Sequence, residues 1–154
     1  MRWTAVAASA VLVCLVLLGR AHSATVLWDC TACGGGTYQH TDSACWVGGT
    51  APGTSDDAEF SCTPSGAVNI TQFTSARYAS LTVSASAAQP VHFVVEDVLE
   101  LEGASSLELS GDGAALTARS SVELGGLGVL EAGAQLHIAA GGSVLEFDNN
   151  SPNA

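Results

Sequence analysis

Three glutamates recur at a constant spacing of 23 residues, namely Glu100, Glu123 and Glu146, and we call them the glutamate row. Stacked on neighbouring strands they would lie about 5 Å apart and repel by about 1 kcal/mol or less per pair in water. We expect this like-charge repulsion to be reduced by solvent, by partial protonation or by a bound metal ion. The favoured interpretation is that solvent screening suffices and the glutamates keep the protein soluble, with no cofactor. Because calcium prefers carboxylate oxygens, the alternative hypothesis is a weak calcium site at the glutamate row.

Four cysteines beyond residue 23 lie close together in the chain: Cys30, Cys33, Cys45 and Cys62. An even number of cysteines in an exported chain predicts two disulfides. The competing interpretation is a zinc site, for which Cys30 and Cys33 supply one half, but Cys45 and Cys62 are too far apart to supply the other. The sequence leaves all three disulfide connectivities open, although a bond between Cys30 and Cys33 would be the most strained.

Two Asn-x-Ser/Thr acceptors predict N-glycosylation, at Asn69 and at Asn149. Because Asn69 stands between Val68 and Ile70, alternation directs its side chain outward, where a glycan can be attached.

The chain shows no constellation typical of an enzyme. The histidines beyond residue 23, His40, His92 and His137, are scattered, and none has a second histidine at metal-binding spacing. Nucleophile elbow, P-loop and His-Glu-x-x-His motifs are absent from the sequence. The acids at 56–59 follow a Gly/Pro run and are interpreted as solvated turn acids. We therefore predict no catalytic residue.

The elements that position the glutamate row are short strands. Each glutamate is the centre of an apolar–polar–apolar triplet, and this alternation is typical of a strand with one face in a core. The triplets are Leu99-Glu100-Leu101, Val122-Glu123-Leu124 and Leu145-Glu146-Phe147. Between them fall glycine-rich turns and two further triplets, of which one keeps the same period and the other slips by three residues. The pattern predicts an all-β parallel β-helix (β-solenoid) with turns of about 23 residues. The alternative is an antiparallel β-sandwich.

The chain divides into four segments. Residues 1–23 are typical of a secretory signal peptide, with an apolar run too short for a comfortable membrane span. Residues 24–66 are expected to form a disulfide-bonded, cysteine-rich N-terminal cap, whose aromatic residues are interpreted as core, with a sugar-stacking platform as the alternative. Residues 67–147 carry the β-helix strands and repeats. Residues 148–154 form a tail in which the repeat breaks off, and we expect the chain to be a fragment of a longer solenoid.

The charge balance excludes some partners. After residue 23 the chain has no lysine, two arginines and fifteen acids, a net charge of −13 with neutral histidines. Such a chain is a poor partner for nucleic acid or for an anionic membrane surface. The 47% content of hydrophobic residues indicates a folded domain and not a disordered acidic segment.

The run from Trp46 to Phe60 follows the pattern W-x-G-G-x-x-P-x-x-x-D-x-A-x-F. It resembles the entry segment of secreted and surface right-handed parallel β-helix proteins of the autotransporter-passenger and pectin-lyase-like type. The resemblance implies apolar strands followed by Gly-rich repeats, as in this chain. Proteins of this type include adhesins, structural surface proteins and polysaccharide-cleaving enzymes, so the resemblance implies a fold more than an activity.

These observations predict a secreted or cell-surface, non-enzymatic β-solenoid module with a structural or adhesive role. The expected partners are cell-surface glycans or other copies of the solenoid, with no insertion into a membrane once the signal peptide is cleaved. The alternative is a fragment of a polysaccharide-active, pectin-lyase-like enzyme. That alternative is disfavoured because the chain has almost no basic residues with which to stabilise a carboxylate intermediate.

Overall fold

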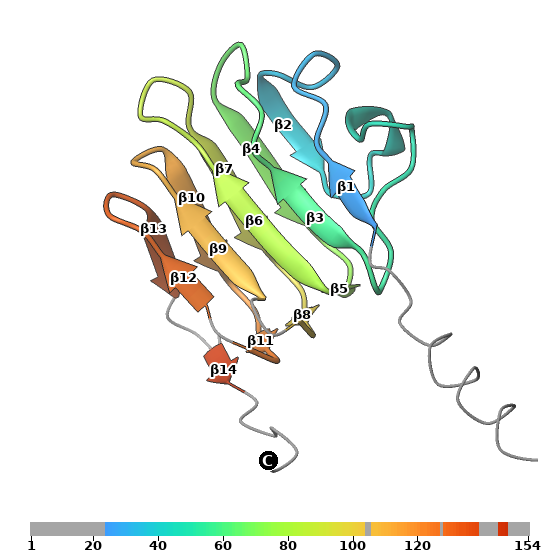
Figure 1. The fold of residues 1–154 in the computed structure, drawn as a ribbon, viewed down its shortest axis with the longest axis vertical. Helices are drawn as coiled ribbons and strands as arrows, with labels where there is room; N and C mark the ends of the chain where they lie inside the picture. The colour runs from blue at the N-terminus through green and yellow to red at the C-terminus, as the bar shows by residue number, and fades with distance from the viewer. Residues whose placement is uncertain (1–23, 104–105, 127, 139–144, 148–154) are drawn as a thin grey trace, which may run out of the picture.

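The structure is a computed structural model that describes residues 24–103, 106–126, 128–138 and 145–147. The chain winds through parallel strands that stack turn upon turn (Figure 1), which confirms the predicted all-β parallel solenoid. The pairings are parallel throughout the three sheets, so the antiparallel sandwich is wrong. The predicted signal peptide, the tail and Asn149 lie outside the described residues.

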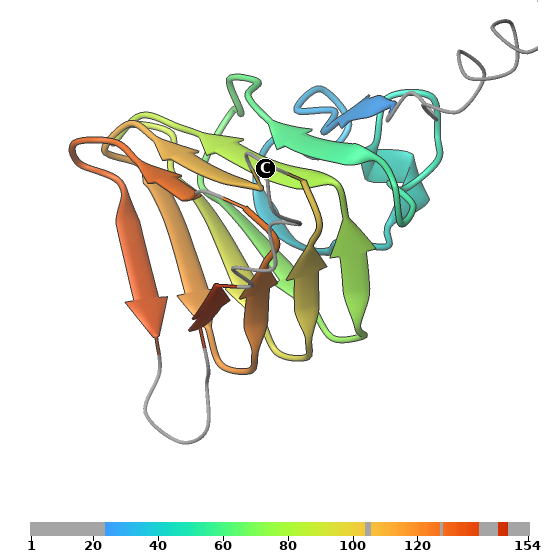
Figure 2. The same ribbon diagram turned by 60° about the horizontal axis from the view of Figure 1, so that its bottom comes forward.

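Three sheets form three walls around one core (Figure 2). The first sheet contains β1 (Thr25–Leu27), β3 (Asp57–Phe60), β6 (Ser80–Ser84), β9 (Leu107–Ser110) and β12 (Gly128–Leu130). The second contains β2 (Gly36–Gln39), β4 (Val68–Gln72), β7 (Val91–Val95), β10 (Ala114–Ala118) and β13 (Gln135–Ile138). The third contains β5 (Ala76–Tyr78), β8 (Leu99–Leu101), β11 (Val122–Leu124) and β14 (Leu145–Phe147).

The core consists of columns of side chains at equivalent positions in successive turns. In the third sheet Tyr78, Leu101 and Leu124 pair in register and are almost fully buried. Leu99 and Val122 form the next inward column and are also buried, as predicted from the alternation. The side chains of Leu145 and Phe147 lie outside the described part of the structure. Because each inward residue packs on its counterparts above and below, burial of the apolar columns stabilises the stack.

The 23-residue period begins earlier than the sequence pattern suggests. β5 pairs with β8 in the same register that joins β8 to β11, so Ala76-Arg77-Tyr78 belongs to the repeat. The period also varies, because Leu81 pairs with Leu107 and Leu116 pairs with Leu136. These changes in length are taken up by the corners between strands, while the strands stay in register.

The corner between β9 and β10 shows why glycine recurs in this chain. Gly111 adopts a φ of +82°, a conformation that side-chain-bearing residues rarely adopt. A Cβ added at Gly113 would collide with the backbone carbonyl of Ser86 in the preceding turn. Corners of successive turns therefore stack backbone on backbone.

Residues 24–66 contribute strands to the stack as well as a disulfide-bonded end. Within this segment β1, β2 and β3 extend the first and second sheets, and a short 3-10 helix, η1 (Ser43–Cys45), lies between β2 and β3. The disulfides join Cys30 to Cys62 and Cys33 to Cys45, which confirms the two predicted bonds and gives their connectivity.

An aromatic cluster lies beside the disulfides. Trp28 and Trp46 are 3% and 2% exposed, and each packs against Phe60 with ring centroids 5.2 and 5.0 Å away. The indole N–H groups are satisfied internally, by the carbonyls of Cys33 and His40. The two tryptophans therefore belong to the core, as interpreted from the sequence, and are not a sugar-stacking platform.

Candidate functional site

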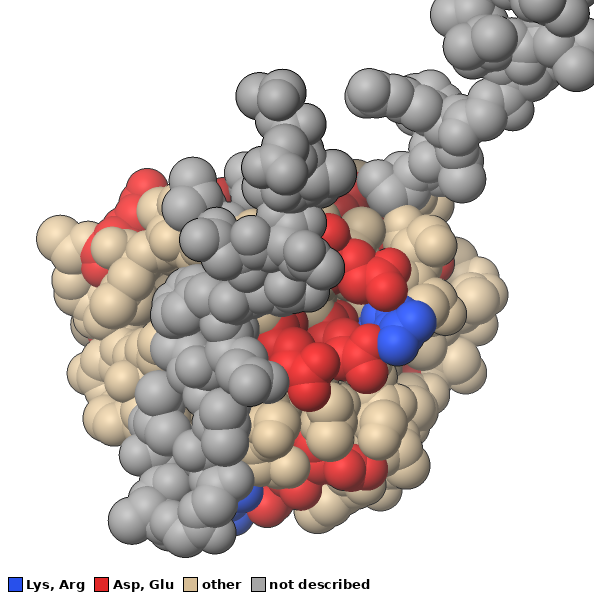
Figure 3. Space-filling model, turned by 90° about the horizontal axis from the view of Figure 1, so that it is seen from below, with Lys and Arg blue, Asp and Glu red and all other residues tan. Residues whose placement is uncertain are grey.

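The glutamate row lies on the outer face of the third sheet, and the position before its first glutamate is occupied by an arginine. Glu100 and Glu123 pair in register, and Arg77 occupies the equivalent position on β5. The Arg77 guanidinium forms an ion pair with Glu100 and approaches Glu102, with Nη1 3.4 Å from Oε1. Figure 3, which views this side of the molecule, shows acidic side chains gathered beside a basic one.

Arg77 reduces the repulsion between the stacked glutamates, and nothing in the sequence indicated this. From the sequence, with its few cations, only solvent, protonation or a metal ion was expected to relieve the repulsion between the stacked glutamates. The structure shows instead that one arginine partly neutralises the first glutamate of the row. Within the described residues, no group of three or more His, Cys, Asp or Glu side chains is placed to hold a metal ion. The side chain of Glu146 is outside that set, so the calcium site stays a prediction.

Calcium binding at the glutamate row would change the melting temperature of the protein. We expect millimolar calcium to raise the melting temperature slightly more than sodium at matched ionic strength, because a divalent cation relieves repulsion between stacked carboxylates. The Glu123→Gln variant should lose this difference, and Arg77→Gln should enlarge it by releasing Glu100. Thermal melts of the parent and both variants in the two salts measure this difference. If each protein melted identically in calcium and in sodium, solvent screening alone would account for the stacked glutamates.

A second candidate surface is the outer face of the second sheet, which we call the polar face. Asn69, His92, Ala115 and Gln135 pair in register along one line of it. A shallow groove of about 360 Å³ runs over this line and includes the neighbouring His137. The half-exposed position of Asn69, between buried Val68 and Ile70, matches the outward direction predicted for it. Glycosylation at Asn69 stays a prediction.

The polar face offers hydrogen-bonding groups with little charge. His92 Nε2 lies 2.8 Å from Thr117 Oγ1, and His137 Nε2 lies 3.0 Å from Gln135 Oε1. Burial lowers the pKa of His92, and the nearby His137 and Arg119 lower it further. A neutral imidazole both donates and accepts a hydrogen bond, which suits hydroxyl groups of a ligand.

The acids at 56–59 act in local structure. Asp56 Oδ2 accepts a hydrogen bond from the backbone N–H of Gly53 at 2.8 Å, and Asp57 Oδ1 accepts one from the Ser80 hydroxyl at 2.6 Å. Glu59 Oε1 accepts one from the Ser61 hydroxyl. The first of these bonds closes the turn before β3, so a turn role is observed for Asp56.

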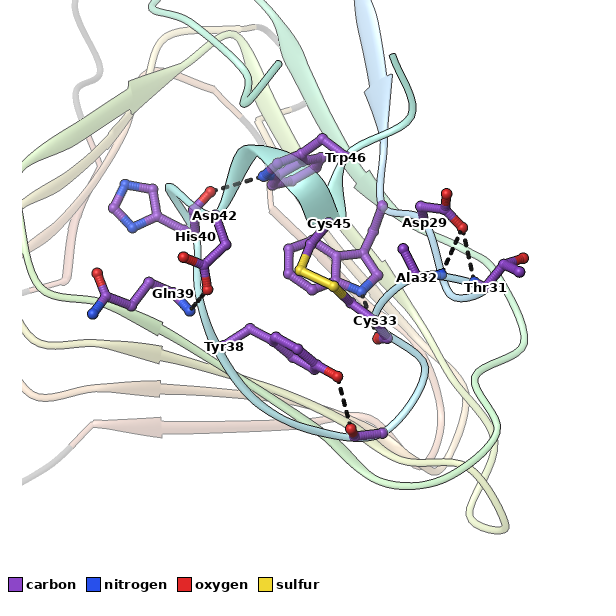
Figure 4. The surroundings of a disulfide bond; sticks show 12 residues. Asp29, Thr31, Ala32, Cys33, Tyr38, Gln39, His40, Asp42, Cys45 and Trp46 are labelled. Atoms are coloured by element: carbon purple, nitrogen blue, oxygen red, sulfur yellow. Dashed lines mark hydrogen bonds between the residues drawn. A yellow bond between two sulfur atoms is a disulfide. The ribbon is translucent and has the colours of Figure 1, made fainter. Parts of the chain in front are cut away.

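His40 is the one buried histidine of the described residues, and sequence reasoning gave it no role. Its side chain is 6% exposed, and its backbone carbonyl accepts a hydrogen bond from Trp46 Nε1 at 2.8 Å (Figure 4). Burial lowers the pKa of the imidazole, against smaller opposite effects of a backbone hydrogen bond with Thr71 and of the Asp42 carboxylate. His40 is therefore neutral at pH 7.

The lowered pKa of His40 makes stability depend on pH. Above the ordinary histidine pKa of about 6.5, folded and unfolded chains are both neutral at this site, and the stability is fully present. As the pH falls below that value, the unfolded chain binds a proton first, so stability is lost until the folded-state pKa is passed. We expect His40→Gln to reduce the loss of melting temperature between pH 7 and pH 5. His137→Gln, at an exposed histidine, is the control, and equal losses in both variants and the parent would contradict the assignment.

The comparisons with known proteins leave the fold as the basis for classification. No family model matches the chain, and searches of curated proteins and of solved structures found no match either. The geometry defines the chain as a parallel β-solenoid with a disulfide-bonded N-terminal end. The resemblance to autotransporter passengers and pectin lyases rests on the sequence pattern alone. In the described ranges, no helix is long and apolar enough to cross a membrane.

Proposed function

We propose that this chain is an extracellular, non-enzymatic β-solenoid module with a structural or adhesive role, and that its polar face contacts neutral glycans. The observation that carries the proposal is a line of register positions on the second sheet, at the strand spacing of about 4.8 Å, with a groove over it. Three of its four positions, Asn69, His92 and Gln135, carry polar side chains, and Ala115 does not. A surface with donors and acceptors on several parallel strands suits an extended chain of hydroxyl groups.

Three further features support this function. Disulfides are typical of secreted proteins, and both bonds lie at the N-terminal end of the stack. The net charge of −13 after residue 23 opposes binding to anionic polymers, so a neutral glycan is the better partner. Asp112 is the one carboxylate among the described residues that line the groove, and it already accepts a hydrogen bond from the backbone N–H of Ala87 at 2.7 Å.

Self-association is the second contact that we propose for the same structural role. Val129 and Leu130 on β12 are 47% and 55% exposed, and β12 is an edge strand of the first sheet in the part of the chain that the structure describes. Exposed apolar side chains beside an edge strand favour association between copies. A lower apparent mass of Leu130→Lys than of the parent in light scattering would support this contact.

Retention on immobilised neutral polysaccharides tests the proposed function. The polysaccharides are mannan, xylan and β-glucan, and the protein is enzymatically deglycosylated, because a glycan on Asn69 would occupy the groove. We expect the exposed pair Gln135→Ala/His137→Ala to weaken retention about tenfold, which corresponds to one or two hydrogen bonds. Glu108→Ala, at an exposed site on the first sheet, is the control. Equal retention of both variants, or no retention of the parent, would contradict the proposal.

A further inference from the structure

The groove over the polar face begins at Asn69, the residue whose sequence context is that of a glycan acceptor. Asn69 is the second residue of β4, and the other lining residues belong to β7, β10, β13 and the corners before β7 and β10. No residue of β2, on the opposite side of β4, lines the groove, although Thr37 pairs with Asn69 there and is exposed. Asn69 therefore stands at one end of the groove, and a group attached to its amide nitrogen has the groove directly beside it.

The side-chain amide of Asn69 is available for such an attachment. His92, the next residue along the polar face, lies within hydrogen-bond distance of the Thr117 hydroxyl. Among the described residues, by contrast, none is hydrogen-bonded to the half-exposed amide of Asn69. An N-glycan takes the place of one amide hydrogen, so its attachment breaks no hydrogen bond of the described structure.

The acceptor sequence Asn69-Ile70-Thr71 has to be modified before β4 is packed into the solenoid. In the folded protein Ile70 is fully buried and Thr71 is 9% exposed, so a transferring enzyme cannot reach the whole sequence. In the transfer, the Asn69 nitrogen bonds to the anomeric carbon of the oligosaccharide, the bond from that carbon to the diphosphate of a lipid-linked donor breaks, and one amide proton is lost. β7, which pairs with β4, is synthesised later. The groove is therefore completed around a glycan that is already in place.

The groove beside Asn69 suits the first sugars of that glycan. His92 follows Asn69 at the strand spacing of about 4.8 Å, and burial lowers the pKa of its imidazole, which is therefore neutral. Ala87 and Pro90 add apolar surface at the corner. A volume of about 360 Å³ is near the lower end of the usual range for ligand pockets, about 300–1,000 Å³, so the outer sugars of a glycan remain in solvent.

We propose that an N-glycan on Asn69 lies along the polar face with its first sugars in the groove, and that it closes the groove to other glycans. The closing of the groove rests on the proposed function, which assigns the polar face to neutral glycans. A tethered ligand meets its site at an effective concentration of the order of millimolar, so the attached glycan excludes free glycans below that concentration. The glycosylation state of Asn69 thus regulates the polar face.

Substitutions at Thr71 remove the glycan while leaving every residue of the groove unchanged. Thr71 does not line the groove. Thr71→Val removes the hydroxyl that the acceptor sequence requires, and Thr71→Ser is the matched control that preserves it. In a third variant, Thr71→Val/Glu108→Asn, the glycan moves to the exposed face of β9, because Leu109 and Ser110 complete a new acceptor sequence there. The parent and the three variants are produced in a eukaryotic secretory host, and peptide mass mapping shows which asparagine carries a glycan.

Labelling of histidines by diethyl pyrocarbonate shows whether the glycan lies in the groove. We expect His92 to be labelled several-fold more slowly in the parent and in Thr71→Ser than in Thr71→Val. Thr71→Val/Glu108→Asn should be labelled at His92 as fast as Thr71→Val, because its glycan lies on another sheet. The buried His40 should stay unlabelled in all four proteins, which shows that they are folded. Equal labelling of His92 in all four, or a parent without a glycan on Asn69, would overturn the inference.

Retention on the immobilised neutral polysaccharides tests the closing of the groove. We expect Thr71→Val and Thr71→Val/Glu108→Asn to be retained, and the glycosylated parent and Thr71→Ser to lose retention. A glycosylated parent that is retained as well as Thr71→Val would overturn the closing of the groove. If Thr71→Val itself were not retained, the proposed function would fail and regulation of the polar face with it, whereas slow labelling of His92 in the parent would still support the position of the glycan.

Discussion

Leu124→Asp is expected to lower the free energy of unfolding by at least about 4 kcal/mol, a large part of the stability of a typical domain. Leu124 is 2% exposed and packs in the inward column of the third sheet, beside Leu101 of the preceding turn. The substitution removes apolar contacts and places a carboxylate in a core that, among the described residues, contains no arginine to pair with it. Chemical denaturation followed by circular dichroism measures the change.

The matched control is Glu123→Asp, on the adjacent residue of the same strand. Glu123 lies on the outer face in register with Glu100, so its carboxylate stays in water and the change should cost under about 1 kcal/mol. Both variants carry an aspartate on β11, on the inward face at position 124 and on the outward face at position 123. If the two denaturation curves moved by the same amount, the assignment of inward and outward faces would be wrong.

Removing the bond between Cys30 and Cys62 is expected to have the second-largest effect. Its cysteines are 32 positions apart, for which loop-closure entropy gives about 3.7 kcal/mol of stabilisation. The bond between Cys33 and Cys45 spans 12 positions, which gives about 2.8 kcal/mol. We therefore expect Cys30→Ala/Cys62→Ala to be less stable than the parent by about 3.7 kcal/mol in denaturant titrations.

The cysteine state is checked before that comparison. Alkylation without reduction, followed by intact-mass measurement, should show no labelled cysteine in the secreted parent and none in the double alanine variant. Two labels in the parent would mean that a bond is absent from the secreted protein. A double variant as stable as the parent would show that the long bond does not constrain the unfolded chain.

The strands of the solenoid were predictable because their signal is local. Leu99-Glu100-Leu101 and Val122-Glu123-Leu124 carry the alternation of a half-buried strand, and their equal spacing gives the register directly. The preceding member, Ala76-Arg77-Tyr78, was missed since alanine and tyrosine mark an inward face weakly and arginine replaces the glutamate. Because this triplet was missed, the ion pair between Arg77 and the first glutamate of the row was not predicted.

The features that joined distant parts of the chain were not predictable. The disulfide connectivity depends on how the segment after β1 folds over the first turn, which no spacing rule encodes. His40 and Tyr78 are brought together only because the second and third sheets begin at different turns.

The regular stacking also bears on how the protein is made. The strand pairings join positions between 20 and 32 residues apart, as in Leu116 with Leu136 and Thr25 with Asp57. The separation does not grow along the stack, so each turn needs only the turn before it as a template. The turn that holds the disulfides and the aromatic cluster is synthesised before the turns that stack on it. Folding can therefore follow synthesis one coil at a time, with each finished coil serving as the surface on which the next one forms.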